Sequence, residues 1–215
     1  MRQLQSLQRA RQALESHSEL MGSCRQLRNI LLSSSAANYF GAILVTGLRG
    51  SSEELATTCG LAKAMAEVST AGVLLVDADC QHPVLHDLFD VPLSPGLSDL
   101  ADDQRELAGV VRPISDRLAL LTNGSDGDRA SRLLSVDPRV RWFGEARDRY
   151  DFIVLNAPAL LSSLTATAAA ALAGNVVLMV EAERDDELSA RKARGLLNQV
   201  GARILGLALV DSRKF

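Results

Sequence analysis

The sequence predicts an α/β fold in which helices flank a doubly wound, mostly parallel sheet, with a helical extension at the N-terminus. From about residue 42, short apolar segments alternate with segments of helical period, which is typical of strands and helices in alternation. The apolar segments are almost uninterrupted, as expected where helices cover both faces of a sheet. The chain has 215 residues, of which 47% are hydrophobic, enough to bury one good-sized core.

We divide the chain into a helical extension over 1–38 and a main domain over 39–215. Leu20, Cys24, Leu27 and Leu31 recur at helical spacing, so we expect one long helix, or two in line, over about 2–32. The segment that follows is rich in serine and indicates a loop.

The main domain is predicted to contain six strands and the helices between them. A short helix and a proline-rich loop are expected in 82–101. The predicted strands are 42–47, 71–79, 118–124, 151–158, 175–182 and 203–211, and the main helices are about 52–69, 130–149, 165–174 and 186–200.

Composition excludes several classes of function. The formal net charge of -3 and the pI near 5.6 give no basic surface for nucleic acid. Cys24, Cys59 and Cys80 fit neither a disulfide framework nor a zinc site, so we expect buried thiols in a cytoplasmic protein. The most apolar stretch, 166–180, is broken by glycine and asparagine and is shorter than the roughly 20 residues that span a bilayer. No direct membrane insertion is therefore expected.

The first predicted strand is followed by a turn in the position of a phosphate-binding loop. Such a loop needs glycines, whose backbone N–H groups surround phosphate, and a lysine that reaches the terminal phosphates. The turn offers Gly47 and Gly50, but the next lysine is Lys63, well inside the helix. Ser51 and Glu54 form a capping box that predicts two hydrogen bonds to free N–H groups at the helix start. The loop is therefore expected to be capped by its own side chains.

Two further strand ends carry polar residues. Asp77 and Asp79 could hold a magnesium-bound water or act as a base; alternatively, Asp79 caps the next turn and Asp77 accepts hydrogen bonds from backbone N–H groups. Asn156 stands where a nucleotide hydrolase would place an aspartate to orient magnesium. His82 and His86 lie near Asp79 but flank a proline, so no metal site is predicted.

From about Cys24 to Asp211, the sequence resembles the cytoplasmic domain of bacterial tyrosine kinases (BY-kinases), which serve capsule and exopolysaccharide assembly. These kinases belong to the MinD/ParA-like group of P-loop ATPases. The segment "LLVDADCQHP" matches the family form LLIDADLRRP, and "YDFIVLNAPA" matches YDFVIIDTPP. The segments "PVLHDLF" and "GLSDLA" match the family patterns between these motifs. The resemblance implies a P-loop NTPase-like fold.

The departures from the family fall on positions that contact nucleotide. The family loop PGEGKST falls on 50–56, which puts Glu54 at the lysine and Leu55 at the magnesium-binding serine. Asn156 replaces the aspartate of the third motif, and Val210 stands where the family has an asparagine near the base. The resemblance thus implies that Glu54, Asp77, Asp79 and Asn156 are vestigial. The vestigial loop comprises Gly47, Arg49, Gly50, Ser51, Ser52, Glu53, Glu54 and Leu55.

Two other features bear on the family's activity. The family's oligomer-forming motif ExxRxxR falls on Gly22, Arg25 and Arg28, so both arginines are candidate contacts to a neighbouring subunit, or else part of a charged helix face. The chain ends in "VDSRKF" without the family's tyrosine-rich tail, and Tyr39 and Tyr150 are its only tyrosines. We expect Tyr150 to be packed near the fourth strand.

Three functions remain open from the sequence. The first is a catalytically degenerate subunit that regulates or scaffolds a membrane polysaccharide copolymerase (a chain-length determinant), sits at the inner face of the membrane through that partner, forms a possible homo-oligomer and needs no cofactor. The second is an active tyrosine autokinase or ATPase, in which Asp77 and Asp79 hold magnesium and Arg49 replaces the lysine at the phosphates of ATP. The third, a MinD/ParA-like positioning factor, lacks an amphipathic segment after Asp211.

Overall fold

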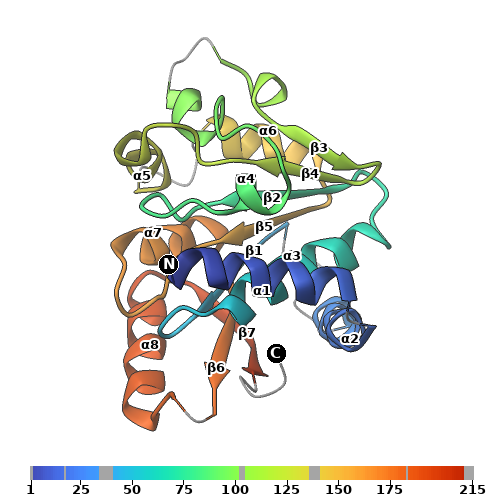
Figure 1. The fold of residues 1–215 in the computed structure, drawn as a ribbon. Helices are drawn as coiled ribbons and strands as arrows, with labels where there is room; N and C mark the ends of the chain where they lie inside the picture. The colour runs from blue at the N-terminus through green and yellow to red at the C-terminus, as the bar shows by residue number, and fades with distance from the viewer. Residues whose placement is uncertain are drawn as a thin grey trace.

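The computed structural model describes residues 2–16, 18–33, 41–101, 105–135, 141–182 and 184–210. Within these ranges the chain forms one sheet with helices on both faces, in the order that the alternating pattern predicts (Figure 1). Among the described residues, no helix combines the length and the apolar character needed to cross a membrane.

Seven strands form the sheet in the order β3-β4-β2-β5-β1-β6-β7. All pairs are parallel except β3 with β4. The mostly parallel, doubly wound sheet is therefore confirmed, as are the six predicted strands, while the antiparallel edge strand β3 was missed. The strands are β1 Ala42–Gly47, β2 Val73–Asp77, β3 Arg112–Ser115, β4 Leu118–Leu121, β5 Phe152–Asn156, β6 Asn175–Glu181 and β7 Arg203–Val210.

The helices follow the predicted positions with two differences. The segment 130–149 was predicted as one helix but contains two, separated by residues 136–140, which lie outside the described ranges. The helices are α1 Arg2–Ser16, α2 Ser18–Ser33, α3 Ser52–Ala66, α4 Leu85–Leu88, α5 Gly127–Ser135, α6 Arg141–Arg149, α7 Leu164–Ala173 and α8 Glu187–Gln199, with 3-10 turns at Leu97–Ala101 and Leu107–Gly109.

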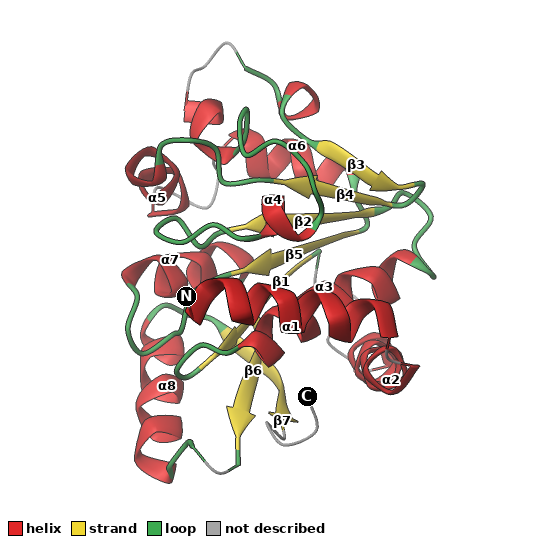
Figure 2. Cartoon of the chain, in the orientation of Figure 1, coloured by secondary structure: helices red, strands yellow, loops and turns green. Residues whose placement is uncertain are grey.

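The second difference concerns the N-terminal helices. Figures 1 and 2 draw α1 lengthwise and α2 nearly end-on, so the two helices meet at a steep angle and the prediction of helices in line is wrong. Ala10 and Ala13 of α1, and Leu20, Cys24 and Leu31 of α2, are buried in the same cluster as the inner face of α3. The steep angle lets each helix bury its own small apolar stripe against the body of the domain. The division at residue 38 stays a prediction.

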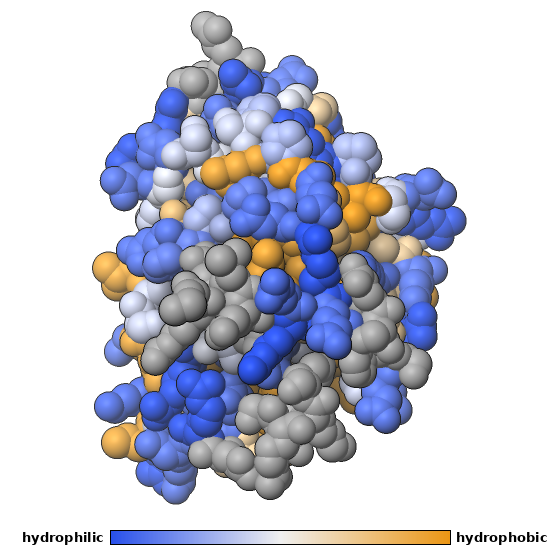
Figure 3. Space-filling view, in the orientation of Figure 1, coloured by the Kyte–Doolittle hydropathy of each residue, from blue (hydrophilic) through white to orange (hydrophobic). Residues whose placement is uncertain are grey.

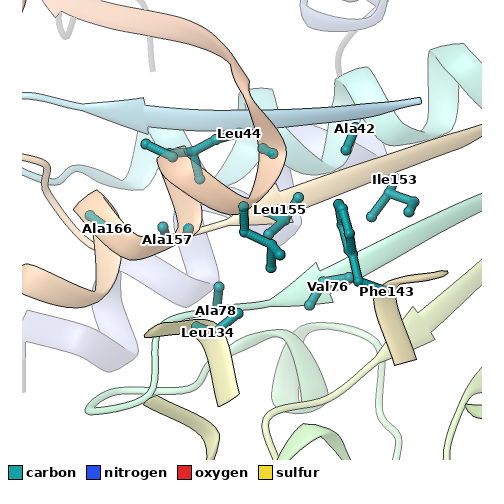
Figure 4. Close-up of a cluster of buried hydrophobic side chains, with 14 of the residues drawn as sticks. Ala42, Leu44, Val76, Ala78, Leu134, Phe143, Ile153, Leu155, Ala157 and Ala166 are labelled. Atoms are coloured by element: carbon teal, nitrogen blue, oxygen red, sulfur yellow. The ribbon is translucent and has the colours of Figure 1, made fainter. Parts of the chain in front are cut away.

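Two apolar clusters lie on opposite faces of the sheet because side chains alternate along each strand. In β1, Ala42 and Leu44 point to the cluster beneath α5, α6, α7 and α8, which Figure 4 shows in close-up. Ile43 and Val45 point to the cluster beneath α1, α2, α3 and α4. The central strands are thus buried on both sides, as their uninterrupted apolar sequences predict.

Candidate phosphate-loop site

Three of the predicted site segments meet at one edge of the sheet. β5 lies between β2 and β1, and the register sets Asp77 beside Asn156. Gly47 ends β1 at the same edge. The Leu160 N–H donates to the Gly47 carbonyl at 2.9 Å, which ties the loop after β5 to the end of β1. The carboxyl ends of parallel strands therefore bring together the residues that the sequence singled out.

The loop after β1 enters α3 through a capped start. Ser51 is the N-cap residue, and its Oγ accepts a hydrogen bond from the Glu54 N–H at 3.3 Å. Gly50 has φ +80°, in the left-handed region that favours glycine. The predicted serine cap of the helix is confirmed.

The Glu54 side chain folds back over the loop. Its carboxylate accepts hydrogen bonds from the backbone N–H groups of Gly47 and Gly50. A Cβ at Gly47 would collide with this carboxylate, so any larger residue there would have to displace the Glu54 side chain from the loop. The second half of the predicted capping box differs: Glu54 binds N–H groups of the loop instead of the free N–H of the helix start. A carboxylate therefore lies where the loop's backbone donors would meet a phosphate.

Burial of the Glu54 carboxyl, together with the nearby acids Glu181 and Asp185, raises its pKa to about 7, against the lowering effect of the two loop N–H groups. The sequence reasoning missed Glu181 and Asp185 as neighbours of this site. The available signal was the acidic run after the fifth predicted strand, whose carboxyl end lies at the same edge of the sheet.

Arg49 is held by acids from the segment before α8. Its Nε lies 3.2 Å from Oδ1 of Asp185, whose side chain is only 3% exposed, and its terminal nitrogen lies 3.9 Å from Asp186. Oδ2 of Asp185 in turn accepts the Glu181 N–H at 2.8 Å. The arginine that the sequence offers as a substitute for the missing lysine is therefore committed to an ion pair beside the loop.

Two of the remaining loop residues are buried. Glu53 is buried, and Leu55 belongs to the apolar cluster beneath α3. Leu55 therefore packs in the core at the position where the family pattern has a magnesium-binding serine. Of Ser52, only its place at the start of α3 is described.

Asp77 is fully buried, and both of its carboxylate oxygens accept hydrogen bonds. Its Oδ2 accepts the N–H groups of Val84 and Leu85 at 3.0 and 2.9 Å. Its Oδ1 accepts the Asp79 N–H at 3.3 Å and the Asn156 amide at 3.4 Å. Burial raises the pKa of Asp77 to about 7 in spite of these donors. The predicted backbone hydrogen bonds of Asp77 are confirmed.

Asp79 caps the turn that follows β2. Its Oδ1 accepts the His82 N–H at 3.0 Å, as the capping alternative predicts. Burial raises the pKa of the Asp79 carboxyl, while the N–H groups of His82 and Gln81 lower it. In the described ranges, no group of three or more His, Cys, Asp or Glu side chains is placed to hold a metal ion.

A cavity of about 540 Å³ opens beside these residues, between the end of β2 and the starts of α5 and α7. Cys80, Gln81, Asp126 and Thr165 are among the residues that line it. Gln81 belongs to the second motif, where the family pattern has an arginine. The sequence reasoning did not anticipate this cavity, because it forms only where three segments distant in sequence meet.

Arg25 and Arg28 bind within the chain. Arg25 makes a bidentate contact with Glu67, with donor–acceptor distances of 2.6 to 3.1 Å. Arg28, only 9% exposed, donates to the Ala64 carbonyl at 2.8 Å and to Glu67 at 3.0 Å. Both arginines thus fasten α2 to the end of α3, and their predicted role as oligomer contacts stays a prediction.

The remaining predicted positions fall as follows. Tyr150 is partly buried against the cluster beneath α6, as expected, and lies just before β5. Val210 ends β7 and is buried beneath α3. The three cysteines are buried and free, as expected. Tyr39 and Asp211 lie outside the described residues.

Comparisons with known proteins find relatives that carry the name of tyrosine-protein kinases, although no family model matches the chain. CapB of Staphylococcus aureus, which carries the name of a tyrosine-protein kinase, is 28% identical over 186 residues, or 86% of this chain and 81% of CapB. The solved kinase domain of the Escherichia coli tyrosine kinase Etk superposes with a TM-score of 0.82 at 23% identity, over 94% of this chain and 79% of that chain.

A plasmid partition protein of Borrelia burgdorferi gives a TM-score of 0.60 at 16% identity, over 79% of this chain and 78% of that chain, which extends the likeness in fold to ParA-type proteins. The sequence motifs, the strand order and these relatives agree: the chain is a BY-kinase-like P-loop domain.

Proposed function

We propose that the chain is a catalytically degenerate BY-kinase-like protein. It regulates or scaffolds a membrane polysaccharide copolymerase in capsule or exopolysaccharide biosynthesis, and it works at the inner face of the membrane through that partner. The similarity to CapB and the family motifs support the biosynthetic setting. The lost nucleotide-contacting residues support a role without catalysis.

One observation carries the degeneracy: the Glu54 carboxylate binds the loop N–H groups of Gly47 and Gly50. A phosphate of ATP would have to displace this carboxylate and would meet two more acids, Glu181 and Asp185, close by. At an effective dielectric near 20, each unit of like charge about 5 Å away opposes the phosphate by on the order of 3 kcal/mol. The nearest loop cation, Arg49, is already paired with Asp185.

Calorimetry with ATP and Mg²⁺ tests the degeneracy. We expect no heat of binding for the unaltered chain at concentrations where an active loop would saturate. The matched variant Glu54→Lys with Leu55→Ser restores the two lost side chains and reports whether the rest of the loop still accepts phosphate. Micromolar binding by the unaltered chain that Arg49→Ala abolishes would refute the proposal and favour the active kinase or ATPase.

The partner is tested separately. The chain is co-expressed with a copolymerase of the same biosynthetic system, and membranes are solubilised and purified through a tag on the copolymerase. We expect the chain to co-purify in a stable ratio. Failure to co-purify, with both proteins expressed and folded, would contradict the scaffolding role while leaving the nucleotide result intact.

A further inference from the structure

A buried charge cluster joins the loop after β1 to the turn between β6 and α8. Met179 of β6 pairs with Gly47 at the end of β1 and is buried in the apolar cluster beneath α3. Alternate residues of a strand share a face, so Glu181 points to the same side, where Glu54 lies in the first turn of α3. Glu181 is only 6% exposed. Two acids from separate elements therefore meet in a buried place beside the loop.

The β6–α8 turn (residues 181, 182 and 184–186) adds a third acid and a cation. Asp185 accepts the Glu181 N–H through Oδ2 at 2.8 Å. Its Oδ1 is buried and receives no hydrogen bond from the described residues, although Arg49 Nε lies 3.2 Å away as an ion-pair partner. Arg184 lies 3.1 Å from Glu181. Each guanidinium is thus matched to one acid, which leaves Glu54 without an ion pair in the described ranges.

The net charge of this cluster depends on one proton. With the Glu54 carboxyl protonated, two ion pairs remain and the cluster is neutral. With Glu54 ionised, three carboxylates face two guanidinium groups, and one negative charge is buried without compensation. Burial and the two neighbouring acids raise the pKa of Glu54 to about 7, so the change of charge falls near neutral pH.

Other charged groups border the cluster. Asp186 caps α8 by accepting the Ser189 N–H at 2.7 Å and lies 3.9 Å from Arg49. The hydrogen bonds from Ser189 keep the pKa of Asp186 below its usual range, so Asp186 stays ionised near neutral pH. Lys192 of α8 acts on Asp186, and Glu53 is buried in the first turn of α3. The loop after β5, residues 157–163, contributes no charge.

Glu54 is the firmly held side of the cluster. Once ionised, it keeps its hydrogen bonds from the N–H groups of Gly47 and Gly50, which strengthen when the acceptor is charged. It also lies in the first turn of α3, where the helix dipole favours negative charge. Ionisation therefore holds Glu54 in place while it repels the acids of the β6–α8 turn.

The start of α8 is packed more weakly. The buried residues of α8 are Ala193 and Leu197, both beyond residue 192, whereas Leu188 in its first turn is 61% exposed. Figure 3 shows mostly hydrophilic residues at the lower left, where Figure 1 places α8. Little apolar packing thus opposes a displacement of the β6–α8 turn together with the first turn of the helix.

We propose that Glu54 is a proton-controlled latch between the loop and the β6–α8 turn. With the proton bound, the neutral cluster keeps the turn packed against the loop. When the proton is lost, the turn and the first turn of α8 separate from the loop, while Glu54 stays on its N–H donors. The latch does not depend on the proposed function, because it needs neither nucleotide nor partner.

Hydrogen exchange measured by mass spectrometry between pH 5 and pH 8 tests the latch, after correction for the intrinsic pH dependence of exchange. The closed form binds the proton more tightly than the open form, so opening becomes easier as pH rises and levels off above about pH 7. We expect the protection of residues 184–190 to fall by about tenfold or more, which corresponds to a difference of about one pKa unit between the two forms. Low urea should speed exchange in β1 but not in residues 184–190, because the opening is local.

Three variants separate the latch from other causes. Glu54→Gln cannot ionise, so the protection of residues 184–190 should stay high and independent of pH. Asp185→Asn leaves two acids facing two guanidinium groups when Glu54 is ionised, so its protection, whatever its level, should not depend on pH. Glu187→Gln is the matched control, because the Glu187 side chain is 79% exposed and lies in the same segment; it should keep the pH dependence of the parent.

Three results would overturn the proposal. The first is protection of residues 184–190 that does not change with pH in the parent. The second is a pH dependence that Glu54→Gln or Asp185→Asn leaves intact. The third is equal acceleration of residues 184–190 and β1 by low urea, which would show that the segment exchanges only when the whole domain unfolds.

Discussion

Replacing Glu54 with glutamine should change how the stability of the protein depends on pH. Burial raises the pKa of Glu54 from 4.5 to about 7 in the folded protein. The folded state therefore binds this proton more tightly than the unfolded state does. Stability from this group is fully present below pH 4.5, falls as pH rises toward 7, and falls no further above that.

The size of the effect follows from the shift. Each unit of pKa difference corresponds to about 1.4 kcal/mol, so a shift from 4.5 to about 7 corresponds to about 3 kcal/mol when the carboxyl is fully ionised. Glutamine keeps the shape but never ionises. As pH rises from about 5 to about 8, the unfolding free energy of Glu54→Gln should therefore increase by about 3 kcal/mol relative to that of the parent.

Urea unfolding at several pH values measures this difference. The single tryptophan, Trp142, is 3% exposed and provides a fluorescence signal for loss of the core. Asp77 also has a raised pKa, but it titrates in both proteins and cancels in the comparison. Glu187→Gln is the control, because the Glu187 side chain is 79% exposed. Parallel stability curves for Glu54→Gln and the parent would refute the burial of this carboxylate in the loop.

Three further predictions rest on other contacts. Arg28→Ala should lower the unfolding free energy by about 1–3 kcal/mol and speed hydrogen exchange in α2, because the Ala64 carbonyl loses its buried donor and Glu67 keeps only Arg25; exchange rates equal to those of the parent would contradict it. Gly47→Ala should destabilise the parent but cost much less when Glu54 is also alanine, a coupling that a double-mutant cycle of unfolding free energies measures. Asp151→Asn should lower the melting temperature near neutral pH, and the difference should shrink as pH falls from 3.8 toward about 2, because hydrogen bonds lower the pKa of Asp151 to about 2; a constant difference over that range would count against it.

The sheet could be predicted because its central strands are apolar on both faces, a pattern that indicates strands covered by helices on both sides. The strand β3 could not be predicted, because it has only four residues and contains Pro113, which is unfavourable in a strand. Its place at the edge of the sheet makes that proline tolerable. Its alternating half-buried residues resemble an ordinary loop. The angle between α1 and α2 also escaped prediction, since spacing along a sequence reports which face is apolar but not how two helices turn against a third element.

The site was predicted in its residues more than in its contacts. Sequence spacing placed the serine cap of α3 and the backbone hydrogen bonds of Asp77, because both depend on neighbours in the chain. The fold of Glu54 over Gly47 and the pairing of Arg49 with Asp185 depend on how β1 and β6 lie side by side. Contacts of that kind need the register of the sheet, which the sequence did not give in advance.

The burial of Ala10, Ala13 and Leu31 against α3 has a practical consequence for anyone who shortens this protein. An expression fragment that begins at Gly41, just before the first strand, would expose the apolar side of α3 to water and invite aggregation. Fragments for crystallisation or interaction assays should therefore retain both leading helices, even if the binding partner touches only the opposite end of the molecule.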